Sequence, residues 1–288
     1  MKINLKKLDF GYQANNLVLN QISFDFDRPE FICILGPNGV GKSTLIHCMN
    51  KILKPTGGVI MIDDKEINNV RLKDLSKRMG YVPNATEDSF PMTVMDTVMV
   101  GLPGDCRFSI RSEDIRKVRD VLRLLDVEDL AMCNFNELSA GQHQKIMIAR
   151  GLVREPEVLL LDEPTSNLDI KHQIEVTKLL SQLPARKKMT VIMISHDINI
   201  TAKFTDRIIL MANGGIYAVG TPKEVLTREN LATVYGVDAD VVEINGRPHV
   251  ILNDAVSKVS ANRDDGPYPA SVSQSVVSSA GSVQNRPL

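Results

Sequence analysis

Nine consecutive residues near the start of the chain have the composition of a phosphate-binding loop. They follow the apolar run at residues 31–35, precede a helical pattern, and read Gly36-Pro37-Asn38-Gly39-Val40-Gly41-Lys42-Ser43-Thr44. Glycines let successive backbone N–H groups curl around a phosphate, a lysine reaches the outer phosphate oxygens, and a serine hydroxyl ligates Mg²⁺. The spacing therefore predicts a triphosphate site in which Lys42 binds phosphate and Ser43 binds the metal.

Two carboxylates follow a second apolar run. Asp162 and Glu163 come directly after residues 158–161 and precede a proline. Successive residues at a strand end point in different directions, so we expect Asp162 to serve the magnesium shell while Glu163 polarises the attacking water. A third apolar run, at residues 191–194, is followed by His196. Ligands gather at this end of an α/β sheet, and His196 is therefore a candidate sensor of the terminal phosphate.

A second predicted helix start contains a glycine and more polar residues than helix initiation requires. Ser139 and Gln142 form the pattern of a capping box around Gly141, ahead of an amphipathic run. Backbone N–H groups at such an end also hold anions. Because Lys42 already belongs to a phosphate site far upstream, these residues alone leave open what the second site binds.

The order of the apolar runs predicts an α/β fold. Short runs that are apolar at every position are typical of parallel strands buried on both faces, and helical patterns lie between them. The runs are residues 31–35, 158–161 and 191–194, and the helical patterns are residues 43–53, 112–126 and 170–183. We expect a P-loop NTPase core with a mostly parallel sheet.

Other regions depart from this pattern. Residues 3–26 alternate between apolar and polar, which predicts an N-terminal antiparallel β subdomain with a turn near residues 13–16. Residues 208–219 and 241–251 each place Asn-Gly between apolar runs and are expected to be hairpins. The stretch from about 87 to 155 has almost no strand pattern, so we interpret it as an inserted helical subdomain. One domain is expected over residues 1–254, followed by a disordered Ser-rich tail at 255–288.

Composition restricts the partners and the location. The net charge of -1 and pI near 6.5 give no broad basic field, so we do not expect nucleic acid as a partner. The N-terminus has no signal-peptide pattern and nowhere do eighteen apolar residues follow one another, so neither export nor membrane spanning is expected. The cysteines have no C-x-x-C spacing and are interpreted as reduced core residues of a cytoplasmic protein; they are Cys33, Cys48, Cys106 and Cys133.

Five motifs in this order resemble the nucleotide-binding subunit of ATP-binding cassette (ABC) transporters. They are the phosphate loop, ELSAGQ, LLLDEP, SNLD and ISHD, and the resemblance covers roughly residues 1–250. It implies an ATPase with ATP and Mg²⁺ as cofactors. In that family the Ser-x-Gly-Gln helix start binds the γ-phosphate of ATP held by a second subunit. Ser139, Gly141 and Gln142 are therefore expected to complete the site of a second copy in a two-fold homodimer.

The resemblance assigns further positions one at a time. Tyr12 matches the aromatic residue that stacks on adenine, although an inward-packed strand aromatic remains an alternative. Asp169 matches the loop that crosses the dimer interface. Pro37, Asn38 and Thr44 complete the phosphate loop around the nucleotide. The remaining histidines, His47, His143, His172 and His249, have no partners at ligand spacing and are interpreted as structural.

Two positions depart from the family pattern. Asn84 stands where the family has Gln, the residue that touches Mg²⁺ and the attacking water. Asn keeps the amide but is shorter by roughly 1.5 Å of reach, so direct contact with the metal is open, and slower hydrolysis or a bridging water would follow. Ala140 replaces a commoner glycine, and a methyl group there is expected to be mild because Gly141 is retained.

The stretches at residues 87–101, 220–226 and 234–237 are similar to the branch that powers uptake of iron-siderophore complexes, haem and vitamin B12. That resemblance implies an integral membrane permease, a substrate-binding protein acting with the permease, and a peripheral position at the cytoplasmic face of the membrane. The alternatives are another transport ATPase, such as an exporter or a zinc or manganese importer, a soluble ABC regulator of DNA repair or translation, and a non-hydrolysing scaffold suggested by Asn84.

Overall fold

The computed structural model describes residues 1–13, 16–84, 92–102 and 110–255. Over these residues its largest sheet has six strands in the order β10-β9-β3-β8-β7-β6, and all but the edge strand β10 run parallel. The strands are β3 (Phe31–Leu35), β6 (Met79–Val82), β7 (Val158–Leu161), β8 (Thr190–Ile194), β9 (Arg207–Ala212) and β10 (Gly215–Gly220). The expected α/β core is confirmed.

Both faces of the parallel strands are buried, as their unbroken apolar sequences indicate. In β3, Phe31, Cys33 and Leu35 belong to one hydrophobic cluster, while Ile32 and Ile34 belong to the other. The same alternation runs through β7, β8 and β9, because successive side chains of a strand point to opposite faces. Each strand therefore joins two layers, and its carboxyl end is held from both sides.

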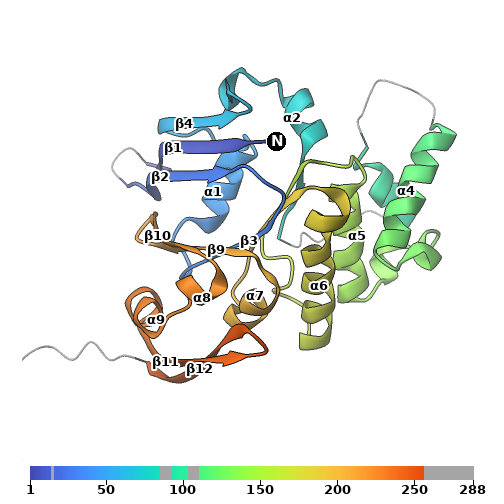
Figure 1. The fold of residues 1–288 in the computed structure, drawn as a ribbon. Helices are drawn as coiled ribbons and strands as arrows, with labels where there is room; N and C mark the ends of the chain where they lie inside the picture. Colours follow the sequence, from blue (N-terminus) through green and yellow to red (C-terminus); the bar gives the residue numbers. More distant parts are fainter. Residues whose placement is uncertain (14–15, 85–91, 103–109, 256–288) are drawn as a thin grey trace, which may run out of the picture. The chain divides into compact units, whose positions relative to one another are not determined.

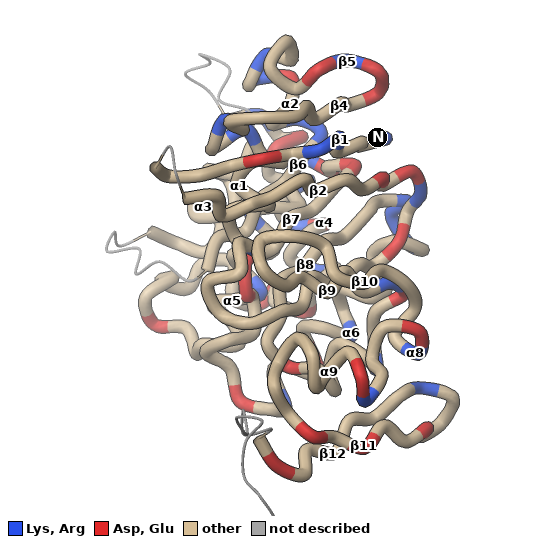
Figure 2. Tube along the Cα trace, turned by 90° about the vertical axis from the view of Figure 1, so that its left-hand side faces the viewer, with Lys and Arg blue, Asp and Glu red and all other residues tan. Residues whose placement is uncertain are grey.

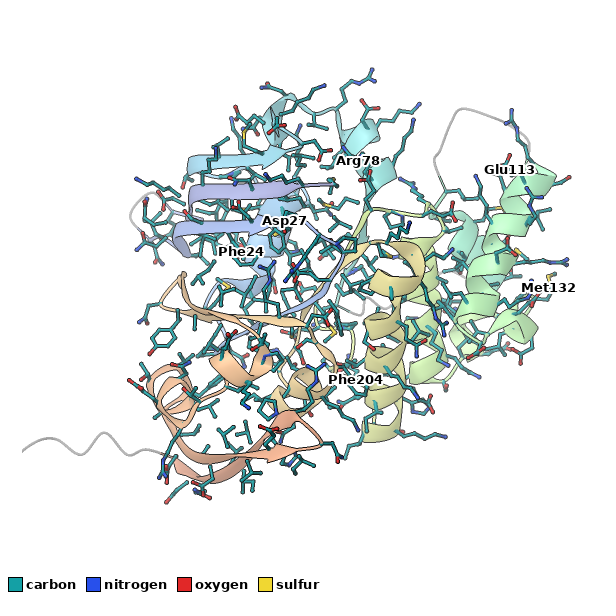
Figure 3. The ribbon with its side chains drawn as sticks, in the orientation of Figure 1. Phe24, Asp27, Arg78, Glu113, Met132 and Phe204 are labelled. Atoms are coloured by element: carbon teal, nitrogen blue, oxygen red, sulfur yellow. The ribbon has the colours of Figure 1, made fainter. Side chains whose placement is uncertain are left out.

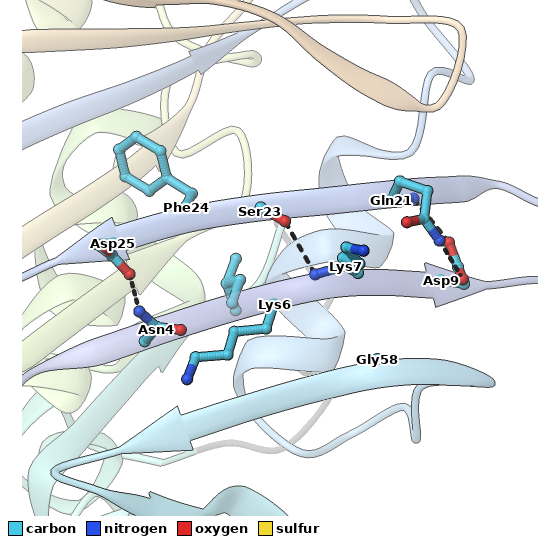
Figure 4. Close-up of a pocket in the computed structure, with 10 residues that line it drawn as sticks. Asn4, Lys6, Lys7, Asp9, Gln21, Ser23, Phe24, Asp25 and Gly58 are labelled. Atoms are coloured by element: carbon cyan, nitrogen blue, oxygen red, sulfur yellow. Dashed lines mark hydrogen bonds between the residues drawn. The ribbon is translucent and has the colours of Figure 1, made fainter.

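An antiparallel sheet forms one of those layers, as expected for the N-terminal region. Its order is β2-β1-β4-β5, and the strands are β1 (Ile3–Phe10), β2 (Leu19–Phe26), β4 (Gly57–Ile62) and β5 (Lys65–Glu66). The register between β1 and β2 shifts where Lys7 and Gln21 adopt positive φ angles of 46° and 52°. Side chains satisfy the displaced N–H groups: Ser23 Oγ accepts from Lys7 at 2.9 Å and Asp9 Oδ1 accepts from Gln21 at 2.7 Å (Figure 4).

Helices cover the other face of the parallel sheet. The helices of the predicted insertion lie on this side, together with α6 (Figure 1). They are α3 (Val94–Met99), α4 (Ser112–Leu124), α5 (Ala140–Leu152) and α6 (Ile170–Lys187), with short 3₁₀ turns at Glu128–Leu130 and Phe135–Glu137. Met95 and Met99 pack against this core. Residues 87–91 and 103–109 of the predicted insertion lie outside the described residues, as does the expected tail beyond Ala255.

Helix α4 ends at Leu124, slightly before the expected 126, and two other helices end further from their expected positions. Helix α1 (Lys42–Met49) is shorter than the expected 43–53, because Lys51 adopts a left-handed φ of 59° and turns the chain. Helix α6 instead continues past Pro184 to Lys187, although a proline usually ends a helix. Pro184 and Leu183 are both buried, so packing against the core favours the longer helix.

The C-terminal part consists of the two predicted hairpins and short helices. In the turn between β9 and β10, Asn213 and Gly214 have φ of 50° and 75°, and the turn between β11 (Val237–Ile244) and β12 (Arg247–Ala255) has the same form. Both hairpins are confirmed, with paired positive φ angles typical of a type I′ turn. The helices are α7 (Ile198–Phe204), α8 (Pro222–Val225) and α9 (Arg228–Tyr235), and α2 (Leu72–Arg78) lies earlier in the chain.

Basic and acidic residues are interspersed along the chain trace (Figure 2). Arg78, at the end of α2 (Figure 3), donates to Glu157 and to Asp63 at 2.5 Å each. The N-terminal ammonium also lies 2.6 Å from Glu157, and these partners hold the pKa of that carboxyl at about 2. The start of β1 is thereby tied to the loop before β7.

The cysteine interpretation needs one correction. Cys33 and Cys48 are buried, and burial raises the pKa of each thiol to about 12. Cys133 is exposed, beside the exposed Met132 (Figure 3), because it lies in the loop between two 3₁₀ turns and not in an apolar element. Cys106 lies outside the described residues. No helix in the described ranges has the length and apolar character needed to cross a bilayer.

Candidate functional site

The sheet topology brings four loops to one edge. Strands β3, β8, β7 and β6 are neighbours and parallel, so their carboxyl ends lie side by side. The phosphate loop follows β3, Asp162 and Glu163 follow β7, His196 follows β8, and Asn84 follows β6. This edge therefore gathers residues from four distant parts of the sequence, which is where α/β sheets bind ligands.

The phosphate loop has the backbone that its glycines allow. Gly36, Gly39 and Gly41 have φ of 150°, 78° and 102°. A Cβ atom on Gly36 would lie 2.5 Å from the Met211 carbonyl oxygen, and one on Gly41 would lie 2.8 Å from that of Val18. Glycine is required at both positions by the approach of neighbouring backbone as well as by φ.

Lys42 closes this loop from the first turn of α1. Its Nζ donates to the carbonyl oxygens of Gly36 at 2.8 Å and Pro37 at 2.9 Å. The side chain is buried, which lowers the pKa of the ammonium, while Glu163 and Asp162 act in the opposite direction. The positive charge is thus held inside the curl of the loop, where the outer oxygens of a bound triphosphate would lie.

Ser43 and Asp162 form the candidate metal site. Ser43 Oγ donates to Asp162 Oδ1 at 2.9 Å. Burial raises the pKa of the Asp162 carboxyl, and the Ser43 hydroxyl only partly offsets this. A hydroxyl and a carboxylate are oxygen ligands suited to Mg²⁺, and a cation beside this desolvated acid would stabilise its charged form. The donor set therefore fits the metal that the sequence predicts.

Glu163 lies between the two other predicted catalytic residues. One carboxylate oxygen forms a hydrogen bond with His196 Nε2, and the other accepts from Asn84 Nδ2 at 3.5 Å. Glu163 has a φ of 49°, the left-handed region that a non-glycine residue adopts at a cost of order 1–3 kcal/mol. Glu163 and His196 help to line a cavity of about 320 Å³.

The remaining predicted residues of the phosphate-loop site surround its mouth. Tyr12 is 66% exposed, packs edge-on against Phe10, and has its hydroxyl 3.4 Å from Thr44 Oγ1. The alternative of an inward-packed aromatic is therefore wrong. Asn38 is exposed at the tip of the loop, and the Val40 side chain packs against Gly36.

The Ser139 group forms a separate site on the same chain. Ser139 caps α5: its oxygen accepts from the Gln142 N–H at 3.4 Å, and Gln142 Oε1 accepts from the Ser139 N–H at 3.0 Å. Asp169 caps α6 and is exposed. Among the described residues no hydrogen bond joins Ser139 or Gln142 to the phosphate loop. The predicted capping box is confirmed. Within the described part of one copy, no hydrogen bond therefore connects the Ser139 helix start to the phosphate loop.

Three residues near these sites had no role in them predicted from the sequence. Ser166 Oγ donates toward Asn84 Oδ1 at 3.4 Å and the Glu163 carbonyl oxygen at 3.1 Å. The Tyr235 hydroxyl accepts from the Gly36 N–H, and burial raises the pKa of that phenol. His172, interpreted as structural, contacts Gly141. Tyr235 and His172 lie outside every motif, and Ser166 opens the SNLD motif without a role assigned to it, because the partners of all three are set by the fold.

Curated relatives agree with the motif order. Residues 19–166 match the family model described as ABC transporter. An uncharacterised ABC transporter ATP-binding protein of Methanocaldococcus jannaschii is 43% identical, over 87% of this chain and 98% of its own. The hemin import ATP-binding protein HmuV of Hahella chejuensis is 35% identical, over 82% of this chain and 94% of its own.

Solved structures agree with the fold. One shows an inward-facing ABC transporter provisionally assigned to the metal-chelate type; it is 29% identical, covers 88% of this chain and 96% of its own, and has a TM-score of 0.75. A dimeric bacterial ABC transporter cassette is 30% identical, covers 76% of this chain and 98% of its own, and has a TM-score of 0.66. The resemblance in sequence therefore extends to the three-dimensional arrangement.

Proposed function

The chain belongs to the ABC transporter family, as an ATP-binding subunit with ATPase activity, and from this premise we propose an import function. ATP hydrolysis by this subunit drives uptake of a metal chelate, an iron-siderophore or haem, through a separate membrane permease. Relatives named for import of hemin and of iron(3+)-hydroxamate support this substrate class. The observation that carries the chemistry is Glu163 bonded to His196 beside the Lys42 loop.

We propose that the phosphate loop holds ATP with its adenine against the exposed ring of Tyr12. Lys42 then exchanges its loop carbonyls for phosphate oxygens, which are stronger acceptors because they are charged. Ser43 and Asp162 would hold Mg²⁺, which neutralises phosphate charge when it is bound. The buried ammonium and the backbone N–H groups at the start of α1, which no side chain caps, fix the triphosphate for attack.

Glu163 is the proposed general base. Its carboxylate takes the proton of the attacking water, His196 holds it through one oxygen, and Asn84 lies near the other. As the base becomes protonated, a negative charge is lost at the carboxylate while charge moves onto the phosphate oxygens. We propose that His196, exposed beside Glu163, then donates to those oxygens.

Two copies of the chain are needed for a complete site. We propose that Ser139, Gly141 and Gln142 of one copy close over the triphosphate in the phosphate loop of the other. The N-terminus of α5 is exposed at Ser139 and has the partial positive charge that favours an anion. A dimeric structure of a similar cassette supports an arrangement of two copies. We propose that Asp169 lies at the interface between them.

A groove of about 460 Å³ is the proposed docking site of the permease. Three of its lining side chains, Ile52, Leu72 and Val100, are apolar and more than half exposed. Arg150 and Arg154 also line it. An apolar surface of this kind suits a helix of the permease, as expected for a transporter subunit that has no membrane-crossing helix in its described part. We propose a peripheral position at the cytoplasmic face and a substrate-binding protein acting with the permease.

Reconstitution with a permease tests the import proposal. The chain is co-expressed with a candidate permease and binding protein, the complex is placed in vesicles, and ATP-dependent uptake of iron chelates, haem and corrinoids is measured. Uptake of a chelate above the level of the Glu163→Gln complex supports the proposal. Transport of free zinc or manganese, or export in place of uptake, would assign the subunit to another transporter class.

Replacing Asn84 with Gln tests whether reach limits hydrolysis. The Asn84 contacts to Glu163 and Ser166 are long, at 3.5 and 3.4 Å, and Gln adds roughly 1.5 Å of reach. We expect the ATPase kcat to lie between the wild-type value and about fivefold above it, and Asn84→Ala to lower it. Steady-state phosphate release measures both, and a lower kcat in Asn84→Gln would mean that the loop is adapted to Asn.

We propose that the ATPase domain spans residues 1–254, with the helical insertion at about 87–155, and that the tail at 255–288 has no part in catalysis. Every residue of the proposed site lies before residue 200. Removing residues 258–288 should therefore leave kcat and the KM for ATP unchanged. A loss of activity in the shortened chain, measured beside the full chain, would contradict this boundary.

A further inference from the structure

Gly141, in the first turn of α5, is in close contact with the imidazole of His172 in α6. A Cβ atom built on Gly141 would lie 2.5 Å from His172 Cδ2 and 2.9 Å from Cγ. Contacts of this length do not occur, so either the ring or the helix start would have to move. The ring therefore occupies the space that any larger side chain at residue 141 would need.

The position of this ring is held by Asp169. One carboxylate oxygen of Asp169 accepts from the His172 backbone N–H at 2.9 Å and lies 2.8 Å from the ring Nδ1. These bonds, together with Lys171, hold the pKa of the Asp169 carboxyl below its usual range. The ring is tied at Nδ1 and presents its opposite edge, Cδ2 and Nε2, to Gly141. It is therefore a fixed spacer between the starts of two helices.

The same segment leads back to Glu163. Ser166 bonds to the Glu163 carbonyl oxygen, and Gln173, next to His172, donates to the Thr165 carbonyl oxygen at 3.1 Å. The stretch from Glu163 to Gln173 is thus internally hydrogen-bonded. It has the base at one end and the ring that contacts the Ser139 helix start at the other.

We propose that His172 is a positioning residue for ATP hydrolysis. It sets where the Ser139 helix start lies relative to the Glu163 segment of the same chain. This inference rests on the proposed function, in which the Ser139 helix start serves the ATP of the second copy and Glu163 serves the ATP of its own copy. A fixed distance between the Ser139 helix start and Glu163 gives both ATP sites of the dimer the same geometry when they close.

The test combines substitutions at both residues. Gly141→Ala should lower the ATPase kcat by about a hundredfold, since it displaces the helix start. His172→Ala should lower kcat by about tenfold with the KM for ATP nearly unchanged, because Lys42 and Tyr12 are untouched. In the double variant the alanine methyl has space, so kcat should equal that of His172→Ala alone. His172→Gln, which keeps a donor for Asp169, should retain more activity than His172→Ala.

His249→Ala, on the exposed edge of β12, is the matched control and should behave as wild type. Multiplicative effects of the Gly141 and His172 substitutions would overturn the proposal, as would a wild-type kcat in His172→Ala. If Gly141→Ala does not fold, the two His172 variants still decide the matter. ATP-dependent dimerisation of the Glu163→Gln variant is measured in parallel, and a failure to dimerise would reject the proposed dimer. The recovery of activity when His172→Ala is added to Gly141→Ala tests only the contact between these two residues within one chain.

Discussion

Glu163→Gln should stop ATP turnover while leaving ATP bound. The amide has the shape of the carboxylate and can still bond to His196 and Asn84, so the site is preserved. It cannot take a proton from water, and loss of a general base reduces kcat by about 10²–10⁴-fold. Phosphate release measures the fall. The nucleotide-bound dimer should then persist, which size-exclusion chromatography in ATP will detect as a species of twice the mass.

The control for this substitution is Glu175→Gln. Glu175 lies on α6 with its side chain 42% exposed and only a 3.9 Å ion pair to Lys171, so removing its charge should leave turnover unchanged. A Glu163→Gln protein that hydrolyses ATP at the wild-type rate would remove Glu163 from the role of base. A protein that loses ATP binding as well would indicate that the carboxylate supports the fold of the loop.

Lys42→Ala should strongly weaken ATP binding itself. The ammonium is the only side-chain cation buried inside the phosphate loop in the described part of the chain, and its two hydrogen bonds aim it at the loop interior. Hydrogen bonds to charged groups contribute about 1.5–3 kcal/mol each, so losing two weakens binding by roughly 10²–10⁴-fold. Titration with a fluorescent ATP analogue gives the change in Kd directly.

Lys171→Ala is the matched control, because Lys171 is exposed on α6 and should not affect ATP affinity. Circular dichroism separates loss of binding from loss of fold. Wild-type affinity in a folded Lys42→Ala protein would mean that the loop backbone and Tyr12 alone hold the nucleotide. In that case the phosphate-loop assignment of Lys42 is wrong.

Local patterns predicted much of this molecule. The phosphate loop, the capping box at Ser139 and the two Asn-Gly hairpins each depend on adjacent residues, whose φ angles and hydrogen bonds are set within a few positions. The unbroken apolar strands indicated burial on both faces. Strands β4 and β6 were not predicted: β4 begins with two glycines, and β6 has only four residues.

The sequence by itself determined which chemical groups are present and which local elements carry them, because glycine conformations, caps and apolar periods are short-range properties. Only the tertiary structure decided which groups meet. Sheet order places Ser43 on Asp162 and Asn84 beside Glu163, across 119 and 79 residues of chain. Tertiary packing also places His172 against Gly141, leaves Cys133 exposed and allows α6 to continue past Pro184. These contacts depend on burial and on the approach of chain segments that are distant in the sequence. No local sequence pattern predicts them.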